Sequence, residues 1–230
     1  MIETLIVDDN LEYVKNTLNN ILSRFKDIQI RYIATTVREA INIIDNNRIG
    51  LILLDLNLPD LNGLEIIKRI KSFNSIEKIR IIIISGDDIL INKANYEYKI
   101  NNIINKLEKE ETIYKKIKQI VDEINSVKIE KNIKEIIVRE ITNMGYNWKY
   151  KGTNYLLEVI WYIYTSNNLD LLDNLENNVY KYIAYKNKKN VNNIKTNIVK
   201  STEKLIKQKE NAMTPKEAIN IILNKLIVRF

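Results

Sequence analysis

The chain has 230 residues and a formal net charge of +7, with 45% hydrophobic and 28% charged residues, which is typical of globular rather than disordered proteins. It has no cysteine and no histidine, which excludes disulfides, thiolate zinc sites, cysteine nucleophiles, Ser-His-Asp triads and a role as the histidine donor in phosphotransfer. No apolar stretch approaches the roughly 18 residues of a membrane span and the amino terminus lacks the basic segment of a signal peptide, so we expect a cytoplasmic protein without membrane association.

The first half of the chain alternates short apolar runs with amphipathic segments. The predicted strands are Thr4–Val7, Ile28–Ala34, Leu51–Leu54, Arg80–Ile84 and Ile100–Ile104. The predicted helices are Leu11–Phe25, Val37–Asn46, Leu64–Ser72, a weaker Ile89–Tyr96, and Glu110–Asn125. Strands that are apolar on both faces belong to a parallel sheet covered by helices on both sides. Residues 1–125 are therefore predicted to form an α/β domain with a doubly wound, five-stranded parallel sheet.

After residue 125 the pattern changes to helices alone. Residues 126–132, "SVKIEKN", are predicted as a short polar linker without Pro or Gly, either irregular or partly helical. The helices predicted beyond it are Ile133–Asn143, Thr153–Thr165, Leu175–Tyr185, Val191–Gln208 and Pro215–Leu226. The last begins with Thr214 as N-cap, Pro215 at the first position and Glu217 three residues after the cap. Residues 133–230 are predicted to form an all-helical second domain.

Polar side chains stand at the predicted carboxyl ends of four strands. Asp8 and Asp9 follow the first strand, Asp55 the third, and Ser85 and Lys106 close the fourth and fifth. Because the carboxyl ends of parallel strands meet at one edge of a sheet, these side chains should converge. Three crowded carboxylates repel one another unless they share a cation, and a set of oxygen ligands favours Mg²⁺, with Ca²⁺ or Mn²⁺ as alternatives.

Four stretches of the first half resemble the receiver domain of bacterial two-component response regulators, which has a flavodoxin-like fold. They are "VDDN" (7–10), "LLDLNLPDLNG" (53–63), "IIIISG" (81–86) and "NKL" (105–107). The resemblance implies that Asp55 is the phosphoacceptor, and a carboxylate can indeed serve as a covalent nucleophile. Pro59 and Gly63 are expected to shape the loop after Asp55, Gly63 by permitting a backbone that a side chain would forbid.

The same resemblance implies roles for the other residues of the cluster. Mg²⁺ would be bound by Asp8, Asp9, Asp55 and the backbone carbonyl of Asn57. Ser85 would bond the phosphoryl group and Lys106 would pair with its charge. A metal ion and a lysine stabilise charge on a transferring phosphoryl group, so the implied roles agree with the residue types.

The first half departs from the receiver pattern at two positions. Leu107 stands where receivers usually have proline, and Ile103 stands where they usually carry a Tyr or Phe that takes part in switching. An aspartate-nucleophile phosphatase also ends a strand on Asp, but that family needs a second Asp two residues later, where this chain has Asn57. We therefore predict no enzyme activity beyond self-phosphorylation from small phosphodonors and slow autodephosphorylation.

The second half is basic. Residues 127–230 carry 18 Lys and Arg against 10 Asp and Glu, whereas residues 1–126 carry 18 against 19. In the helix predicted from Val191, one face carries Val191, Ile194, Ile198 and Leu205, which should be core. The other faces and the preceding turn carry side chains suited to phosphates and base edges. The predicted DNA contacts are Lys188, Lys189, Asn192, Asn193, Lys195, Thr196 and Lys200.

Three stretches of this half resemble the all-helical DNA-binding domain of the stage zero sporulation protein A family. They are "EITNMGYNWKYKGTNYLLEVIWYIY" (140–164), "LENNVYKYIAYKNKKNVNNIKTNIVKS" (175–201) and "TPKEAINIILNKL" (214–226). The resemblance implies a helix-turn-helix whose second helix, about Val191–Leu205, enters the major groove. Lys195, Thr196 and Val199 replace a Glu-Arg pair and a further Arg typical of the family, so the family's DNA sequence does not transfer and a divergent paralogue is one interpretation.

Together the two resemblances predict a phosphorylation-controlled transcription regulator in sporulation or related developmental control. A histidine kinase or phosphotransferase would donate the phosphoryl group, and the phosphorylated chain would form a homodimer. Double-stranded promoter DNA would be the target, with RNA polymerase as a further candidate partner. The alternative is a receiver-based protein-interaction adaptor whose DNA-binding helix is degraded or non-specific.

Overall fold

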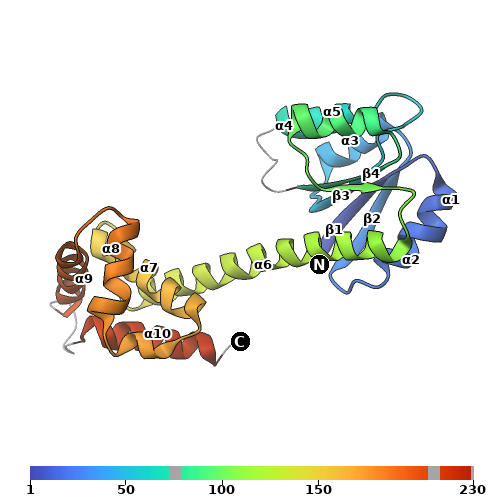
Figure 1. Ribbon diagram of the computed structural model, residues 1–230. Coiled ribbons are helices and arrows are strands. Elements are labelled where there is room, and N and C mark those ends of the chain that lie inside the picture. Colours follow the sequence, from blue (N-terminus) through green and yellow to red (C-terminus); the bar gives the residue numbers. More distant parts are fainter. Residues whose placement is uncertain (73–78, 207–212, 229–230) are drawn as a thin grey trace. The chain divides into compact units, whose positions relative to one another are not determined.

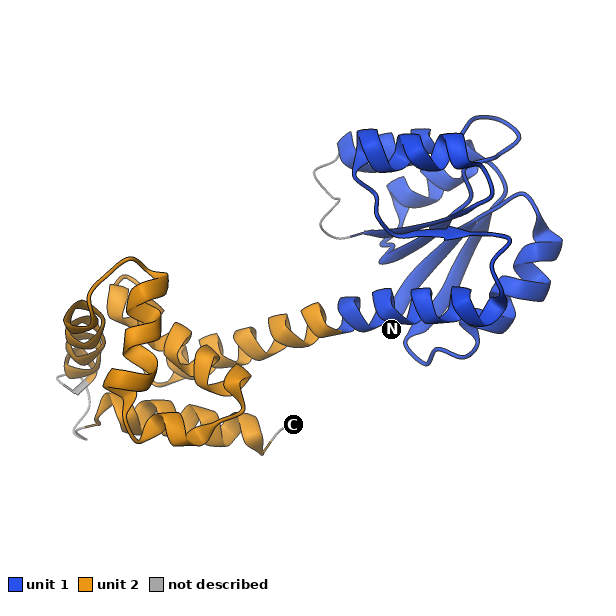
Figure 2. Cartoon of the chain, in the orientation of Figure 1, with its two compact units in different colours: residues 1–125 blue, residues 126–230 orange. Residues whose placement is uncertain are grey.

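The computed structural model describes residues 1–72, 79–206 and 213–228. The chain divides into two compact units, Met1–Asn125 and Ser126–Phe230 (Figure 2). Each unit has a hydrophobic core of its own. In the part of the chain that the structure describes, no helix is both long enough and apolar enough to cross a membrane.

Unit 1 contains one parallel sheet (Figure 1). Its strands are β1 (Ile2–Val7), β2 (Ile28–Ala34), β3 (Leu51–Leu54), β4 (Arg80–Ser85) and β5 (Ile103–Asn105). The strand order is β2-β1-β3-β4-β5, and every neighbouring pair is parallel. All four residues of β3 are buried because helices cover both faces of the sheet. The predicted doubly wound, five-stranded fold of the first half is confirmed.

The helices of unit 1 lie on the two faces of this sheet. They are α1 (Leu11–Tyr13), the π-helical turn η1 (Val14–Leu18), α2 (Asn19–Leu22), α3 (Val37–Asn46), α4 (Leu64–Ser72), α5 (Asp88–Tyr98) and the first part of α6 (Glu110–Asn143). Val37 of α3, Ile67 of α4 and Ala94 of α5 belong to one core cluster with the sheet. Leu18 of η1 and Ile117 of α6 belong to a second cluster on the opposite face. The sheet is thus the middle layer of three.

Several element bounds in the first half differ from the predicted ones, and the structure gives the conformation of the predicted linker. The helix predicted at Leu11–Phe25 contains the π-helical turn η1 and ends at Leu22. β5 begins at Ile103 rather than at Ile100, because Lys99 adopts a left-handed conformation (φ 54°) that ends α5, and Ile100 packs against the core beside that helix end. Residues 126–132 are helical and continue α6, since they contain no Pro or Gly to interrupt it.

The regular elements that the structure describes in unit 2 are all helices or helical turns, joined by short connections. Its elements are the second part of α6, α7 (Lys151–Ser166), the 3-10 turn η2 (Leu169–Leu172), the π-helical turn η3 (Glu176–Tyr180), α8 (Lys181–Lys186), α9 (Val191–Ile206) and α10 (Pro215–Ile227). Helix α9 corresponds to the predicted helix Val191–Gln208, whose residues 207–208 lie outside the described residues. The predicted start of α10 is confirmed, because Thr214 and Glu217 form a reciprocal capping box ahead of Pro215.

Helix α7 and helix α9 pack closely in the core of unit 2. Ile194 and Ile198 of α9 are fully buried, Leu205 is nearly so, and Val191 packs partly buried against them, as the predicted apolar face requires. Gly152 on α7 permits the approach, because a Cβ at this position would lie 1.9 Å from the Asn197 carbonyl oxygen. This packing leaves the remaining faces of α9 toward solvent.

Candidate functional site

The site in unit 1 is built where β1 and β3 end. The Asp8 amide donates to the Ala34 carbonyl at 2.9 Å and the Asp55 amide donates to the Val7 carbonyl at 2.8 Å, so each aspartate directly extends the strand pairing. Asp8 is 1% exposed and Asp55 is 5% exposed. Both carboxylates are therefore held by the sheet itself rather than by a mobile loop.

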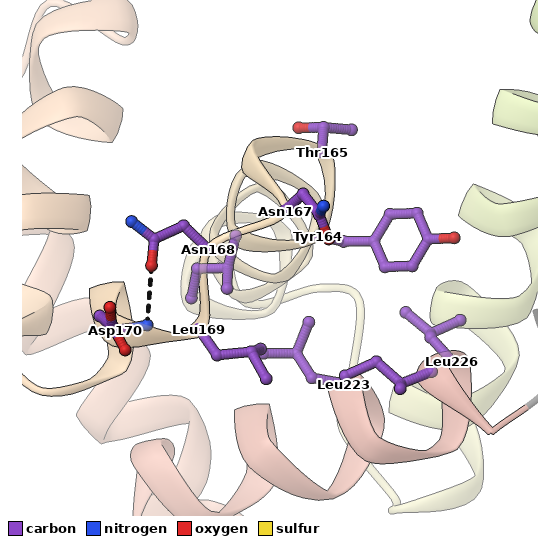
Figure 3. Close-up of a pocket in the computed structure, with 10 residues that line it drawn as sticks. Tyr164, Thr165, Asn167, Asn168, Leu169, Asp170, Leu223 and Leu226 are labelled. Carbon is purple, nitrogen blue, oxygen red and sulfur yellow. Dashed lines mark hydrogen bonds between the residues drawn. The ribbon is translucent and has the colours of Figure 1, made fainter.

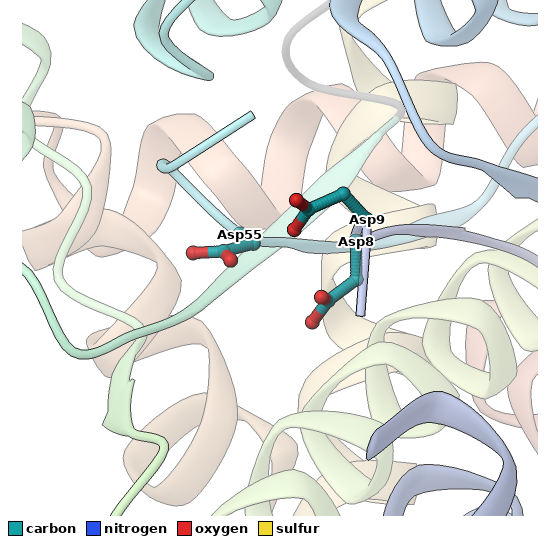
Figure 4. A group of neighbouring side chains, drawn as sticks. All are labelled: Asp8, Asp9 and Asp55. Carbon is teal, nitrogen blue, oxygen red and sulfur yellow. The ribbon is translucent and has the colours of Figure 1, made fainter. Parts of the chain in front are cut away.

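Asp9 completes a cluster of three carboxylates with Asp8 and Asp55 (Figure 4). One carboxylate oxygen from each residue lies within 4.8 Å of the others, and Asp9 is the exposed member. Like charges at this separation repel strongly in a partly buried site. The arrangement is stable at neutral pH only with positive charge nearby.

Lys106, which follows β5, supplies such a charge. Its Nζ lies 2.6 Å from Asp55 Oδ2 and 2.8 Å from Asp8 Oδ2, and its side chain is only 19% exposed. Burial acts to lower the Lys106 pKa, but the hydrogen bonds to Asp55 and Asp8 outweigh it and the pKa is raised. Burial raises the Asp8 pKa, and the hydrogen bond from Lys106 only partly opposes that effect. Lys106 is thus a fixed cation in contact with two of the three carboxylates.

Ser85 and Asn57 lie at the same edge of the sheet. Ser85 is the last residue of β4 and fully buried; its carbonyl accepts a hydrogen bond from the Lys106 amide at 3.3 Å, and its Oγ accepts one from the Asp87 amide at 3.4 Å. The Asn57 amide donates to Asp55 Oδ1 at 3.2 Å, which places this peptide beside the carboxylate. The structure brings together Asp8, Asp9, Asp55 and Lys106, and it places the peptides of Ser85 and Asn57 against two of them.

Gly63 and Asp60 support the loop that follows Asp55. The Gly63 amide donates to the Leu56 carbonyl at 2.9 Å, and a Cβ on Gly63 would lie 2.5 Å from the Asp55 carbonyl oxygen. Glycine is needed here for close approach to the backbone. The Asp60 carboxylate accepts bonds from the first two amides of α3, at 2.8 and 3.1 Å, and so ties the loop to that helix. No local pattern in the sequence signals this long-range anchor.

Tyr13 is a neighbour of the site that the sequence interpretation missed. Its ring centroid lies 5.1 Å from Lys106 Nζ. The Asn10 side chain caps α1 by accepting from the Tyr13 amide at 2.9 Å, so the turn directly after Asp8 and Asp9 sets where the tyrosine lies. The Asn cap followed by an aromatic three residues later was the available signal.

The two residues that depart from the receiver pattern occupy different surroundings. Ile103, the first residue of β5, is partly buried and packs against the core cluster formed with α3, α4 and α5. Leu107, which stands where receivers usually have proline, is 90% exposed and its side chain does not pack against the core.

The predicted DNA contacts lie between the turn before α9 and Lys200 in the second half of that helix. Lys188 and Lys189 lie in the turn before it, and all seven predicted residues are exposed. Lys195 Nζ, however, lies 2.6 Å from Glu176 Oε2 of η3, and both side chains are about half exposed. The structure therefore presents a basic, asparagine-rich surface with one lysine engaged in an exposed ion pair.

Unit 2 also has a cavity of about 830 Å³ beside the ends of α7 and α10 (Figure 3). Its lining combines Leu169, Leu223 and Leu226 with polar residues such as Asn168 and Asp170. The Asp170 amide donates a hydrogen bond to Asn168 Oδ1 at 2.9 Å. Asp170 is the single acidic or basic residue among those that line the cavity in the described structure. The charged groups suited to phosphoryl or metal chemistry are in unit 1.

The donor set in unit 1 fits a hard divalent cation. Asp8, Asp9 and Asp55 offer three carboxylate oxygens within 4.8 Å of one another, which suits Mg²⁺, Mn²⁺ or Ca²⁺ better than a metal that prefers nitrogen or sulfur ligands.

Known proteins resemble the first unit. The family model for the response regulator receiver domain matches residues 4–118, which is half of the chain. The transcriptional regulatory protein MalR of Bacillus subtilis is 35% identical over 86 residues, 37% of this chain and 35% of MalR. A protein-glutamate methylesterase/protein-glutamine glutaminase of Methanospirillum hungatei is 33% identical over 82 residues, 36% of this chain and 24% of that enzyme. The chain thus spans about a third or less of these relatives.

Solved structures match the same region. A CheY-like receiver domain protein from Methanospirillum hungatei has a TM-score of 0.46 and 26% identity, covering 55% of this chain and 98% of its own. The response regulatory domain of mrkE from Klebsiella pneumoniae has a TM-score of 0.49 and 19% identity, covering 54% and 99%.

Proposed function

The chain belongs to the response regulator receiver domain family, and from that premise we propose that it is a phosphorylation-controlled transcription regulator. Asp55 accepts a phosphoryl group from a histidine kinase or phosphotransferase, and unit 2 binds promoter DNA, in sporulation or related developmental control. The observation that carries the proposal is the buried Asp55 carboxylate, bonded to Lys106 at 2.6 Å within a cluster of three aspartates.

In the proposed reaction, an Asp55 carboxylate oxygen forms a bond to phosphorus as the bond between phosphorus and the donor's atom breaks. The donor leaves with that electron pair. Negative charge then accumulates on the phosphoryl oxygens, and fixed donors aimed at it stabilise the transfer. Lys106, which already lies against Asp55 Oδ2, is placed to pair with those oxygens, and the buried Ser85 hydroxyl at the neighbouring strand end is the proposed further donor.

Asp8, Asp9, Asp55 and the backbone carbonyl of Asn57 would hold a Mg²⁺ ion. When bound, the ion would offset two of the three carboxylate charges and stabilise charge on the phosphoryl oxygens. The protein's own contribution is to keep the carboxylates together at the strand ends and to exclude most water from Asp8 and Asp55.

A matched pair of substitutions tests the phosphoacceptor. The wild-type chain and the Asp55→Asn variant are incubated with acetyl phosphate and Mg²⁺, and the covalent phosphoryl group is measured by intact mass. The Asp45→Asn variant is the control, since it removes an aspartate of the same unit that pairs with Arg69 on the surface. We expect modification of the wild type and the control but not of Asp55→Asn. An unmodified wild type, or equal modification of Asp55→Asn, contradicts the proposal.

Unit 2 is proposed to act as a helix-turn-helix in which α8 precedes the turn and α9 enters the major groove. The support is the order of the two helices, the burial of Ile194 and Ile198, and the exposure of the seven basic and polar residues named above. Phosphorylation is proposed to release or dimerise this unit, since a charge change at Asp55 can bias an element with two states.

Genomic DNA captured by the phosphorylated chain and sequenced at two salt concentrations tests this part. One enriched sequence motif is the expected result. Lys200→Ala should weaken binding and reduce the slope of log affinity against log salt by about one, because each phosphate contact releases about one counterion. Lys216→Ala, which removes an exposed lysine on α10, should leave the slope unchanged.

A protein-interaction adaptor is the second candidate. The ion pair of Lys195 with Glu176 favours it, because that lysine is engaged within unit 2. Salt-sensitive DNA binding without a motif would indicate a non-specific role, and no binding at either salt concentration would support the adaptor.

A further inference from the structure

The Tyr13 side chain lies against the charged centre of the site in unit 1. Its ring centroid is 5.1 Å from Lys106 Nζ, and the same ammonium group bonds Asp8 at 2.8 Å and Asp55 at 2.6 Å. An aromatic ring within about 6 Å of an ammonium group is attracted to it. The ring is therefore a direct neighbour of the lysine that bridges the two buried carboxylates.

The Tyr13 hydroxyl is a buried polar group without a protein partner. Among the described residues its Oη has no hydrogen-bond partner, and the other such oxygen is Glu108 Oε2. The Glu108 case is ordinary, because its second oxygen accepts from Lys116 at 2.6 Å. Burying a hydroxyl without a hydrogen bond costs free energy of folding. The Tyr13 hydroxyl is therefore a candidate for binding a group that the protein itself does not supply.

The electrostatic surroundings of the hydroxyl indicate what it can bind. Burial raises the pKa of Tyr13 to about 12, and the negative charges of Asp8, Asp55 and Glu110 add to the effect. Tyr13 is consequently a protonated hydrogen-bond donor at neutral pH, within electrostatic reach of the carboxylate that would carry the phosphoryl group. A phosphoryl group brings three strong acceptor oxygens to that place.

We propose that the Tyr13 hydroxyl donates a hydrogen bond to the phosphoryl group on Asp55, which makes Tyr13 a phosphoryl-binding residue of this site. The inference rests on the proposed phosphorylation of Asp55. Tyr13 is followed at once by the π-helical turn Val14–Leu18, and such turns often accompany functional sites. In the phosphorylated state the Tyr13 hydroxyl would then have a hydrogen-bond acceptor, which the unphosphorylated protein does not provide.

The test uses beryllofluoride, an analogue of the phosphoryl group, with Mg²⁺ present. Its dissociation constant is measured by fluorine NMR for the wild-type chain, Tyr13→Phe and Tyr32→Phe. Tyr32→Phe is the matched control, because the Tyr32 hydroxyl donates to Asn47 at 2.8 Å rather than lying unpaired by the site. Thermal unfolding without beryllofluoride checks that each variant folds.

We expect Tyr13→Phe to bind beryllofluoride about tenfold more weakly or worse, since a hydrogen bond to a charged group is lost. Its thermal stability without the analogue should equal or exceed that of the wild type, because the lost hydroxyl had no partner. Wild-type affinity in Tyr13→Phe would overturn the inference while leaving the proposed function intact. A wild-type chain that acetyl phosphate does not modify on Asp55 would overturn the proposed function, and this inference with it.

Discussion

Replacing Lys106 by methionine removes the ammonium group from between Asp8 and Asp55 and keeps an unbranched side chain of similar length. In the wild type this group bonds both carboxylates, and it is only 19% exposed. In the variant, the carboxylates of Asp8, Asp9 and Asp55 still lie within 4.8 Å of one another, but the positive charge that paired with two of them is gone.

The structure sets the size of the effect. Two unit charges 4.8 Å apart repel by about 3.5 kcal/mol at an effective dielectric constant of about 20. Breaking a buried ion pair by removing one partner costs about 3–5 kcal/mol for the same reason. We therefore expect Lys106→Met to lower the free energy of unfolding by about 3 kcal/mol at pH 7 without divalent ions. Millimolar Mg²⁺ should recover most of the loss, because the ion replaces the missing positive charge.

The pH dependence follows from Asp8. Burial raises the Asp8 pKa above its ordinary value of 3.8, and the hydrogen bond from Lys106 opposes the rise. A carboxyl group with a raised pKa contributes most to stability below its unfolded pKa, and this contribution is lost as the pH rises through the folded pKa. Without Lys106 the Asp8 pKa should rise further, so the deficit of the variant should shrink as the pH is lowered from 7 toward 5.

Urea unfolding in EDTA, followed by circular dichroism, measures these differences. Lys116→Met is the matched control, because Lys116 also bonds a carboxylate at 2.6 Å but is 43% exposed. An exposed pair of this kind contributes at most about 1 kcal/mol. The reasoning is refuted if Lys106→Met is no less stable than Lys116→Met, or if its deficit stays constant between pH 7 and pH 5.

Four further substitutions probe contacts with the backbone, each measured by urea or thermal unfolding. Gly63→Ala should destabilise unit 1 by about 1–3 kcal/mol and lower the phosphorylation rate, because the new Cβ would meet the Asp55 carbonyl oxygen at 2.5 Å. Gly152→Ala should destabilise unit 2 by about 3 kcal/mol or more, because the new Cβ would lie 1.9 Å from the Asn197 carbonyl oxygen. This clash outweighs the better helix propensity of alanine. Gly86→Ala is the control and should be nearly neutral, because a Cβ there would have no neighbour within 4 Å. Thr214→Ala should cost about 1 kcal/mol by removing the N-cap of α10, and an unchanged unfolding midpoint would contradict that role.

Much of the fold of unit 1 could be read from local pattern. Apolar runs bounded by amphipathic segments predicted all five strands and their parallel pairing, and two of them, Ile28–Ala34 and Leu51–Leu54, have the predicted bounds. Such runs are informative because a strand buried on both faces cannot tolerate polar residues. The pattern failed at Ile100, which is apolar because it packs beside a helix end. It left the conformation of residues 126–132 open, and the structure shows them as part of α6.

The sequence by itself determined which chemical groups stand at the strand ends: three carboxylates, a hydroxyl and a lysine, with no histidine or cysteine to compete. Their convergence followed from strand direction alone, because parallel strands end at one edge. Only the tertiary structure decided that Lys106 bonds both Asp8 and Asp55, and that the Tyr13 ring lies 5.1 Å from its ammonium group. Such contacts join residues far apart in the chain, and their distances depend on register, helix rotation and side-chain rotamers, which no local pattern of residues records.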